Sequence, residues 1–256
     1  MKSNYRYIVK AFMAMAVIAG TTSCDDFLDR EPMSSISPET YYSTAAQLEA
    51  NLNDEYPNVL PSFGQWTYGI FGEDKGTDNQ IEVNANDRYT QDRWKVPHSE
   101  SDNWKFERIY RINFFLSEAL PKFGEDMSGS QNTISGSVAT IKHYIGEMYF
   151  LRAYEYFKKL QLFGDFPIID QPLADEMEAL REASKRFPRN EVARFIISDL
   201  DKAYAYMSDV DMATTRINKD AAMLVKSRVA LFEATWLQNF KGTAFVPGGE
   251  GWPGAS

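Results

Sequence analysis

The feature that most constrains this fold is a run of helical sequence, residues 138–163, that is apolar around most of its circumference. Apolar residues recur in it every three or four positions: Ile141, Ile145, Met148, Tyr149, Ala153, Tyr156, Phe157 and Leu160. This spacing predicts a long α-helix that is buried along much of its length. Gly164 is placed for a left-handed C-cap, and Pro167 prevents the helix from resuming. Several neighbouring helices are needed to cover such a surface, so we expect an all-α protein.

Charged residues in this helix have two predicted roles. Glu155 can pair with Lys158 and Lys159, three and four positions along, on a side expected to face solvent. Three other polar residues lie in or beside the most apolar part: Glu147, Arg152 and Asp165. We expect them to form buried hydrogen-bonded pairs or caps that fix the helix register, with ligand contact as the alternative.

The residues from Gly146 to Ile169 resemble the hallmark helix of the SusD/RagB family of outer-membrane nutrient-uptake lipoproteins. An acidic Glu147 precedes Phe-Leu-Arg-Ala at 150–153, Tyr-Phe at 156–157 and Gly-Asp-Phe-Pro at 164–167. The resemblance implies tetratricopeptide-like helical pairs with long irregular loops. It also implies a protein that captures oligosaccharide and passes it to a TonB-dependent outer-membrane transporter, without being an enzyme and without a cofactor.

Other stretches supply the expected neighbours of the central helix. A capping box at 44–47 predicts a helix that Pro57 stops, and residues 104–120 predict one that ends at Pro121. Residues 174–182 predict one or two short amphipathic turns. Residues 189–207 predict another helix, and Asn218 is expected to cap the last one. The inward seam expected for that last helix is Ala222, Val225, Val229, Phe232 and Trp236. Trp104 and Trp236 are both expected on helical seams, in the core.

The N-terminus predicts a lipoprotein signal peptide. Residues 1–10 carry basic side chains, residues 11–20 are apolar, and small residues at 21–23 precede Cys24. Cys24 is the only cysteine, so no disulfide competes for it, and we expect a lipid on its thiol. Thr21 stands where such signals usually have leucine. A cleaved, soluble periplasmic protein with a spare thiol is the alternative. The sequence Cys-Asp-Asp-Phe-Leu-Asp resembles the mature start of SusD-like proteins, implying a cell-surface lipoprotein in the outer membrane of a Gram-negative bacterium.

These features divide the chain into four expected parts. Residues 1–23 form the signal peptide, 24–43 a lipid-anchored tether, 44–240 the SusD-like helical domain, and 241–256 a loop in which the chain is truncated relative to the family. The formal net charge is −9 over 256 residues, with no basic tract, which argues against binding to nucleic acid.

Residues 58–101 have no sustained period and are rich in Gly, Asp, Asn and aromatic residues. A loop of this length within a domain is usually functional or poorly ordered. The flat C–H faces of a sugar lie well on aromatic rings, and its hydroxyls need polar partners. The resemblance also implies that this region contacts glycan. The candidate ligand-binding residues are Trp94, Asp78, Trp66, Tyr68 and Arg93; alternatively, the aromatic residues pin the loop onto the helices.

Catalytic and metal chemistry find little support. The two histidines, His98 and His143, have no nucleophile motif around them. His143 and Glu147 are four apart, but without a third ligand they predict an exposed or capped polar pair and no metal site. Two alternative functions stay open: a surface lipoprotein glycosidase that uses paired carboxylates, and a purely structural helical-repeat adaptor.

Overall fold

The computed structural model describes residues 41–61, 74, 79–80, 103–124, 126–208, 212 and 215–248. Within these ranges the secondary-structure elements are six α-helices, and no strand is present. The helices are α3 (Ala45–Val59), α4 (Glu107–Phe123), α5 (Val138–Phe163), α6 (Met177–Ala183), α7 (Arg189–Tyr206) and α8 (Lys219–Phe240). The prediction of an all-α protein is therefore confirmed. None of the described helices is both long and apolar enough to cross a membrane.

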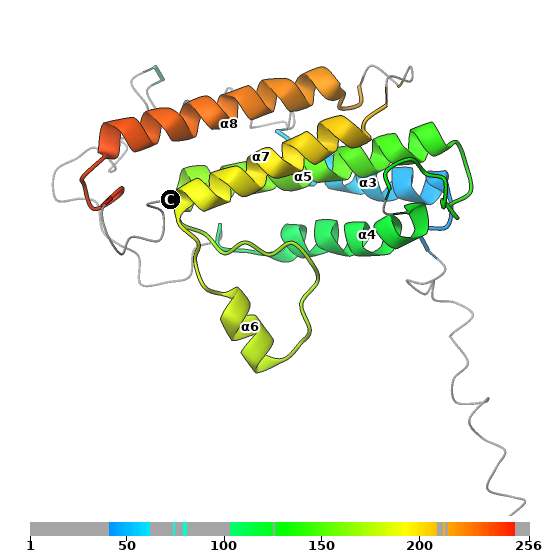
Figure 1. Cartoon of the computed structure of the whole chain (residues 1–256), viewed down its shortest axis with the longest axis horizontal. Coiled ribbons are helices and arrows are strands. Elements are labelled where there is room, and N and C mark those ends of the chain that lie inside the picture. The colour runs from blue at the N-terminus through cyan, green and yellow to red at the C-terminus, as the bar shows by residue number, and fades with distance from the viewer. Residues whose placement is uncertain are drawn as a thin grey trace, which may run out of the picture. The chain divides into compact units, whose positions relative to one another are not determined.

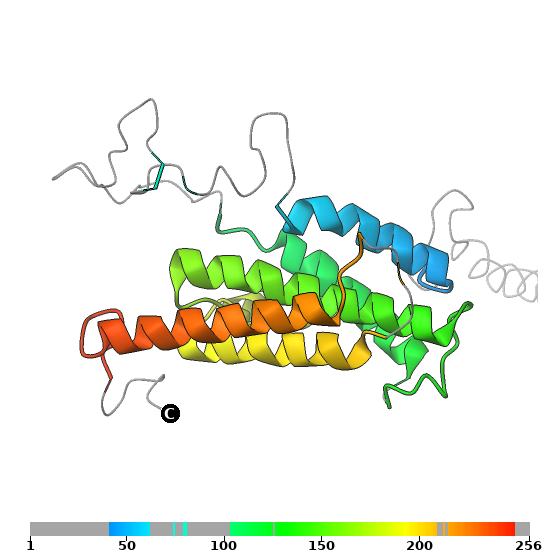
Figure 2. The same cartoon turned by 90° about the horizontal axis from the view of Figure 1, so that it is seen from above.

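The five long helices run alternately in opposite directions along the chain, as Figures 1 and 2 show. Helix α5 lies at the centre and packs against α3, α4 and α7, while α8 packs mainly against α7. The short α6 projects away from the other helices and has no buried residue. The expected antiparallel helical pairs are thus present, with α5 as the element that the others cover.

Helix α5 has the predicted bounds, and its apolar stripe is buried. Ile141, Ile145, Met148 and Tyr156 have no exposed surface. Gly164 ends the helix with a φ of 70°, which a glycine adopts without strain, and its N–H donates to the Leu160 carbonyl at 3.0 Å. Its ψ of −98° lies outside the left-handed helical region, so the expected left-handed cap is not formed.

The prediction that Glu155 and its lysines face solvent is wrong. The Glu155 carboxylate lies 3.6 Å from Lys158 Nζ and 3.2 Å from Lys159 Nζ, so the expected ion pairs exist. However, only 3% of Glu155 is exposed, and Lys159 is also buried. The reason is that this side of α5 meets the C-terminal end of α3 and the chain just before α4, to which the two lysines donate hydrogen bonds.

Two helix ends differ from the predictions because proline is tolerated in a last helical turn. Pro57 lies within α3 and Pro121 within α4, each two residues before the end of its helix. A proline there removes one backbone hydrogen bond, and the helix continues briefly beyond it. The start of α3 is as predicted: Thr44 and Gln47 form a complete capping box.

Helix α4 begins at Glu107, later than predicted, so Trp104 lies before the helix and not on its seam. The Trp104 ring packs edge-on against Phe163 and Phe166, with both pairs of ring centroids 4.8 Å apart. These contacts hold Trp104 against the end of α5, in the segment that precedes α4.

Helix α8 is capped as predicted, since the Asn218 side chain accepts a hydrogen bond from Ala221 N at 2.9 Å. Its predicted seam is only partly buried: Ala222 and Val229 are covered, whereas Val225, Phe232 and Trp236 are half-buried. The seam is incomplete because α7 is the only helix among the described residues that makes extensive contact with α8.

At Gly146 the backbone of α5 closely approaches the C-terminal end of α7. A Cβ atom at this position would lie 2.8 Å from Met207 N and 2.9 Å from the Ala203 carbonyl oxygen. Alanine normally stabilises a helix relative to glycine by about 0.5–1 kcal/mol. Here we expect Gly146→Ala to lower the free energy of unfolding by about 1–3 kcal/mol, because the two backbones must separate. Urea denaturation measures this change, and a variant more stable than the parent would contradict the close approach.

Candidate functional site

The residues predicted to contact glycan are Trp66, Tyr68, Asp78, Arg93 and Trp94, and all of them lie outside the described residues. Cys24, the predicted lipidation residue, also lies outside them. Both assignments stay predictions. What the structure describes is how the chain on either side of this region is held, together with a cavity that the sequence analysis did not anticipate.

The two ends of the region predicted to bind glycan are attached to neighbouring residues of α5. Lys158 Nζ donates to the Val59 carbonyl at the end of α3, and Lys159 Nζ donates to the Asn103 carbonyl at 2.8 Å. Both lysines are held by the buried Glu155. Burial lowers the pKa of Lys158, and the Glu155 carboxylate opposes this shift. One acid therefore organises both attachments.

Glu147 joins three segments through a buried network. Its carboxylate accepts hydrogen bonds from Tyr56 Oη of α3 at 2.9 Å and from Arg216 Nε at 2.8 Å. His143 Nε2 lies 3.0 Å from Glu147 Oε1 and 3.0 Å from the Ile217 carbonyl oxygen. The predicted polar pair of His143 and Glu147 is confirmed, but it is buried and not exposed. In the described part of the chain, no three His, Cys, Asp or Glu side chains are grouped to hold a metal ion.

Arg152 forms a second buried network. Its guanidinium donates to Asp199 of α7 from Nε at 2.6 Å and from Nη2 at 2.9 Å. Its Nη1 donates to Asn113 Oδ1 of α4 and to the Asp170 carbonyl, both at 2.9 Å. Burial alone would lower the pKa of Arg152, but the bonds to Asp199 raise it, so the guanidinium stays charged.

Asp165 forms a cap, as predicted, but it is exposed and not buried, and one further buried pair was missed. Asp165 Oδ1 accepts a hydrogen bond from Arg189 N at 2.9 Å, at the start of α7. Arg189 also pairs with Glu233 of α8, with Nη2 and Oε2 2.8 Å apart. These two partners are far apart in the sequence, and a helical period does not connect them. All three predicted polar residues thus stabilise the packing of helices.

The buried Tyr149 and Tyr156 and the half-buried Tyr56 complete these networks as neutral phenols. Burial raises the pKa of Tyr149 to about 12, and it also raises the pKa values of Tyr56 and Tyr156. Tyr156 Oη donates to the Ile169 carbonyl at 3.0 Å and accepts from Ile169 N at 2.8 Å. The backbone just after α5 is therefore fixed to the core.

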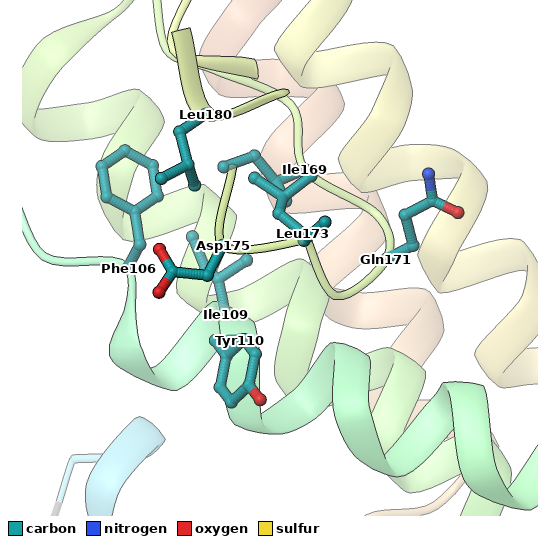
Figure 3. Close-up of a pocket in the computed structure, with 9 residues that line it drawn as sticks. Phe106, Ile109, Tyr110, Ile169, Gln171, Leu173, Asp175 and Leu180 are labelled. Carbon is teal, nitrogen blue, oxygen red and sulfur yellow. The ribbon is translucent and has the colours of Figure 1, made fainter. Parts of the chain in front are cut away.

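A cavity of about 240 Å³ lies between the first turn of α4, the segment from Ile169 to Asp175, and Leu180 of α6 (Figure 3). Its lining residues are Phe106, Ile109, Tyr110, Ile169, Gln171, Leu173, Ala174, Asp175 and Leu180. The lining is mostly apolar, with a phenol, an amide and a carboxylate among it. Sequence reasoning missed this cavity because its residues come from three separate stretches. The amphipathic pattern at 174–182 was the one available signal.

These features define a helical scaffold whose buried charged residues stabilise the packing of the helices. The cavity of Figure 3 is a candidate binding site on this scaffold. Residues 26–231 match the SusD-like family model described as starch-binding and associating with the outer membrane. The chain belongs to this family, as its sequence motifs predicted.

Individual relatives agree with this assignment. SusD-like proteins P2 and P25 of Formosa agariphila are each 25% identical to this chain, over 94% and 84% of its length. The match covers 46% and 41% of those two proteins, so the chain spans less than half of their length. The crystal structure of a SusD-like carbohydrate-binding protein from Bacteroides fragilis has the same fold, with a TM-score of 0.52 and 18% identity. That alignment covers 79% of this chain and 40% of the Bacteroides protein.

Proposed function

We propose that this chain acts as a cell-surface, lipid-anchored glycan-binding protein that captures oligosaccharide and passes it to a TonB-dependent outer-membrane transporter. The observation that carries the proposal is the family match over residues 26–231, which includes the whole of α3 to α7. The description of the Bacteroides fragilis relative as carbohydrate-binding supports it. The mechanism is binding and handover, so we assign no catalytic residue and no cofactor.

A panel of polysaccharide gels tests this function. The intact chain is expected to be retarded by at least one glycan gel without releasing reducing ends. Release of reducing ends that is lost on substitution of an Asp or Glu would replace the proposal with a glycosidase. Failure to bind any glycan, together with co-purification of a partner protein, would replace it with a structural adaptor.

The anchor proposed at Cys24 requires residues 1–23 to act as a signal peptide and residues 24–43 as a tether outside the helical domain at 44–240. A thiol-linked diacylglyceryl group with a further acyl chain holds a protein stably at a membrane. We therefore expect Cys24→Ser to move the protein from the membrane fraction to the soluble fraction. Fractionation and labelling with radioactive palmitate measure this change, with Ser23→Ala as a neighbouring control. A Cys24→Ser variant that stays fully in the membrane would contradict the anchor.

The glycan contacts are proposed in the region between α3 and α4, with Trp94 and Asp78 as the first choices and Trp66, Tyr68 and Arg93 beside them. Loss of one stacked aromatic ring is worth about 0.5–1.5 kcal/mol. Trp94→Ala should therefore weaken glycan binding about two- to tenfold while the far-ultraviolet circular dichroism stays unchanged. Affinity electrophoresis measures the binding. Unchanged affinity would place the contacts elsewhere.

A further inference from the structure

We propose that the cavity between α4, the segment 169–175 and α6 is a subsite for one neutral sugar ring of the captured glycan. The proposal rests on the proposed function and adds a location and a sugar class to it. Figure 3 shows the side chains that surround the cavity. Its volume of about 240 Å³ equals about eight water molecules at about 30 Å³ each, which is room for one sugar ring.

The apolar surface of the cavity is held in place before any ligand arrives. The Phe106 ring stacks on Phe166, with centroids 5.2 Å apart and planes 17° apart, and Trp104 packs edge-on against Phe106. Phe106 also lines the cavity, together with Ile109. An aromatic and aliphatic surface of this kind suits the C–H face of a pyranose.

The backbone on the other side of the cavity is fixed by buried polar groups. The Ile169 carbonyl accepts hydrogen bonds from Tyr156 Oη at 3.0 Å and from Asn113 Nδ2 at 2.8 Å. The next carbonyl, that of Asp170, accepts from Arg152 Nη1 at 2.9 Å. A site whose walls are already ordered loses less entropy on binding. The buried Arg152 network therefore also positions this wall of the cavity.

The polar groups at the cavity point to a neutral sugar. Tyr110 is 52% exposed, and both Gln171 and Asp175 are exposed. A phenol, an amide and a carboxylate together donate to and accept from sugar hydroxyls. Asp175 is the one charged side chain among the described residues that line the cavity. A carboxylate repels a uronate or a sulfated sugar, so we expect uncharged rings here.

Affinity electrophoresis of the full chain in gels of soluble starch, laminarin and polygalacturonate tests the subsite. Tyr110→Ala and Asp175→Ala alter exposed side chains, so neither should disturb the core. Tyr110→Ala, which removes a ring, and Asp175→Ala, which removes a hydrogen-bonding group, are each expected to weaken retention by starch or laminarin about two- to tenfold. The matched control is Tyr204→Ala, which removes a tyrosine of α7 that is 45% exposed and does not line the cavity. It should bind like the parent.

The outcomes separate this subsite from the proposed function. Binding of the parent to a neutral glucan, weakened by Tyr110→Ala and Asp175→Ala but not by Tyr204→Ala, supports the subsite. If all three variants bind the neutral glucan as strongly as the parent does, the subsite is overturned and the glycan-binding function stands. Retention of the parent by polygalacturonate alone also overturns the subsite and leaves the glycan-binding function standing. If none of the three gels retains the parent chain, the subsite is overturned together with the proposed glycan-binding function on which it rests.

Discussion

Replacing Arg152 with alanine is expected to lower the free energy of unfolding by about 3–5 kcal/mol, because it leaves the buried Asp199 carboxylate with only Lys202, 3.7 Å away, as a counter-charge. Asp199 has no exposed surface, and Arg152 supplies two hydrogen bonds to it. The substitution also removes the donor to Asn113 and to the Asp170 carbonyl, so α4, α5 and α7 all lose a shared contact. At about 2–4 °C per kcal/mol, the melting temperature should fall by roughly 6–20 °C.

The matched control is Arg194→Ala on the outer side of α7. Arg194 pairs with Glu191 three residues earlier, and its side chain is 54% exposed. Exposed pairs of this kind contribute about 0–1 kcal/mol. The double variant Arg152→Met with Asp199→Leu should recover much of the loss, since it removes both buried charges. If Arg152→Ala costs no more than Arg194→Ala, the buried pair is not what holds these helices together.

Replacing Glu147 with alanine should be comparably harmful, with a loss of about 3–5 kcal/mol. Glu147 has no exposed surface and accepts hydrogen bonds from Tyr56 and Arg216. Its loss leaves the Arg216 side chain, only 9% exposed, without its principal counter-charge. The attachment of α3 and of the segment before α8 to the central helix would weaken together.

Glu49→Ala provides the control, because Glu49 is a second partner of the same arginine. It lies 3.4 Å from Arg216 Nη1, and its side chain is 44% exposed. We expect its removal to cost less than about 1 kcal/mol in urea denaturation. A Glu49→Ala variant as unstable as Glu147→Ala would show that Arg216, and not the buried acid, determines the stability of this region.

Helix α5 could be predicted from the sequence because one pattern, the spacing of its apolar residues, indicates both the helix and its burial. An apolar residue at every third or fourth position has one simple explanation, so both ends of α5 were found. The roles of Glu147 and Arg152 followed because charges in such a stripe need buried partners. Their partners are distant in the sequence, Arg216 in the segment before α8 and Asp199 on α7, and no local pattern identifies them.

The errors came from places where tertiary contacts override local preference. Pro57 is a helix breaker on average, yet α3 tolerates it in its last turn. Trp104 has a helical neighbourhood, yet contacts with Phe163 and Phe166 hold it outside α4. Glu155 and its lysines have the spacing of an exposed charge pair, but their side of α5 is covered.

The candidate site was less predictable than the fold. Residues 58–101 have no period, so local chemistry and family resemblance were the only guides to Trp94 and Asp78. The cavity of Figure 3 depends on how Phe106, Ile169 and Leu180 come together, which no single stretch encodes. Apolar residues there would otherwise be taken for ordinary core or surface positions.

The attachment of Val59 and Asn103 to adjacent lysines has a consequence for how this scaffold can diversify. Val59 and Asn103 are held at adjacent positions of α5, by two lysines that both pair with Glu155. The entropy of closing a loop grows only slowly with its length. An insert of another size or composition is therefore expected to be tolerated between these two carbonyls while the hydrophobic core stays the same.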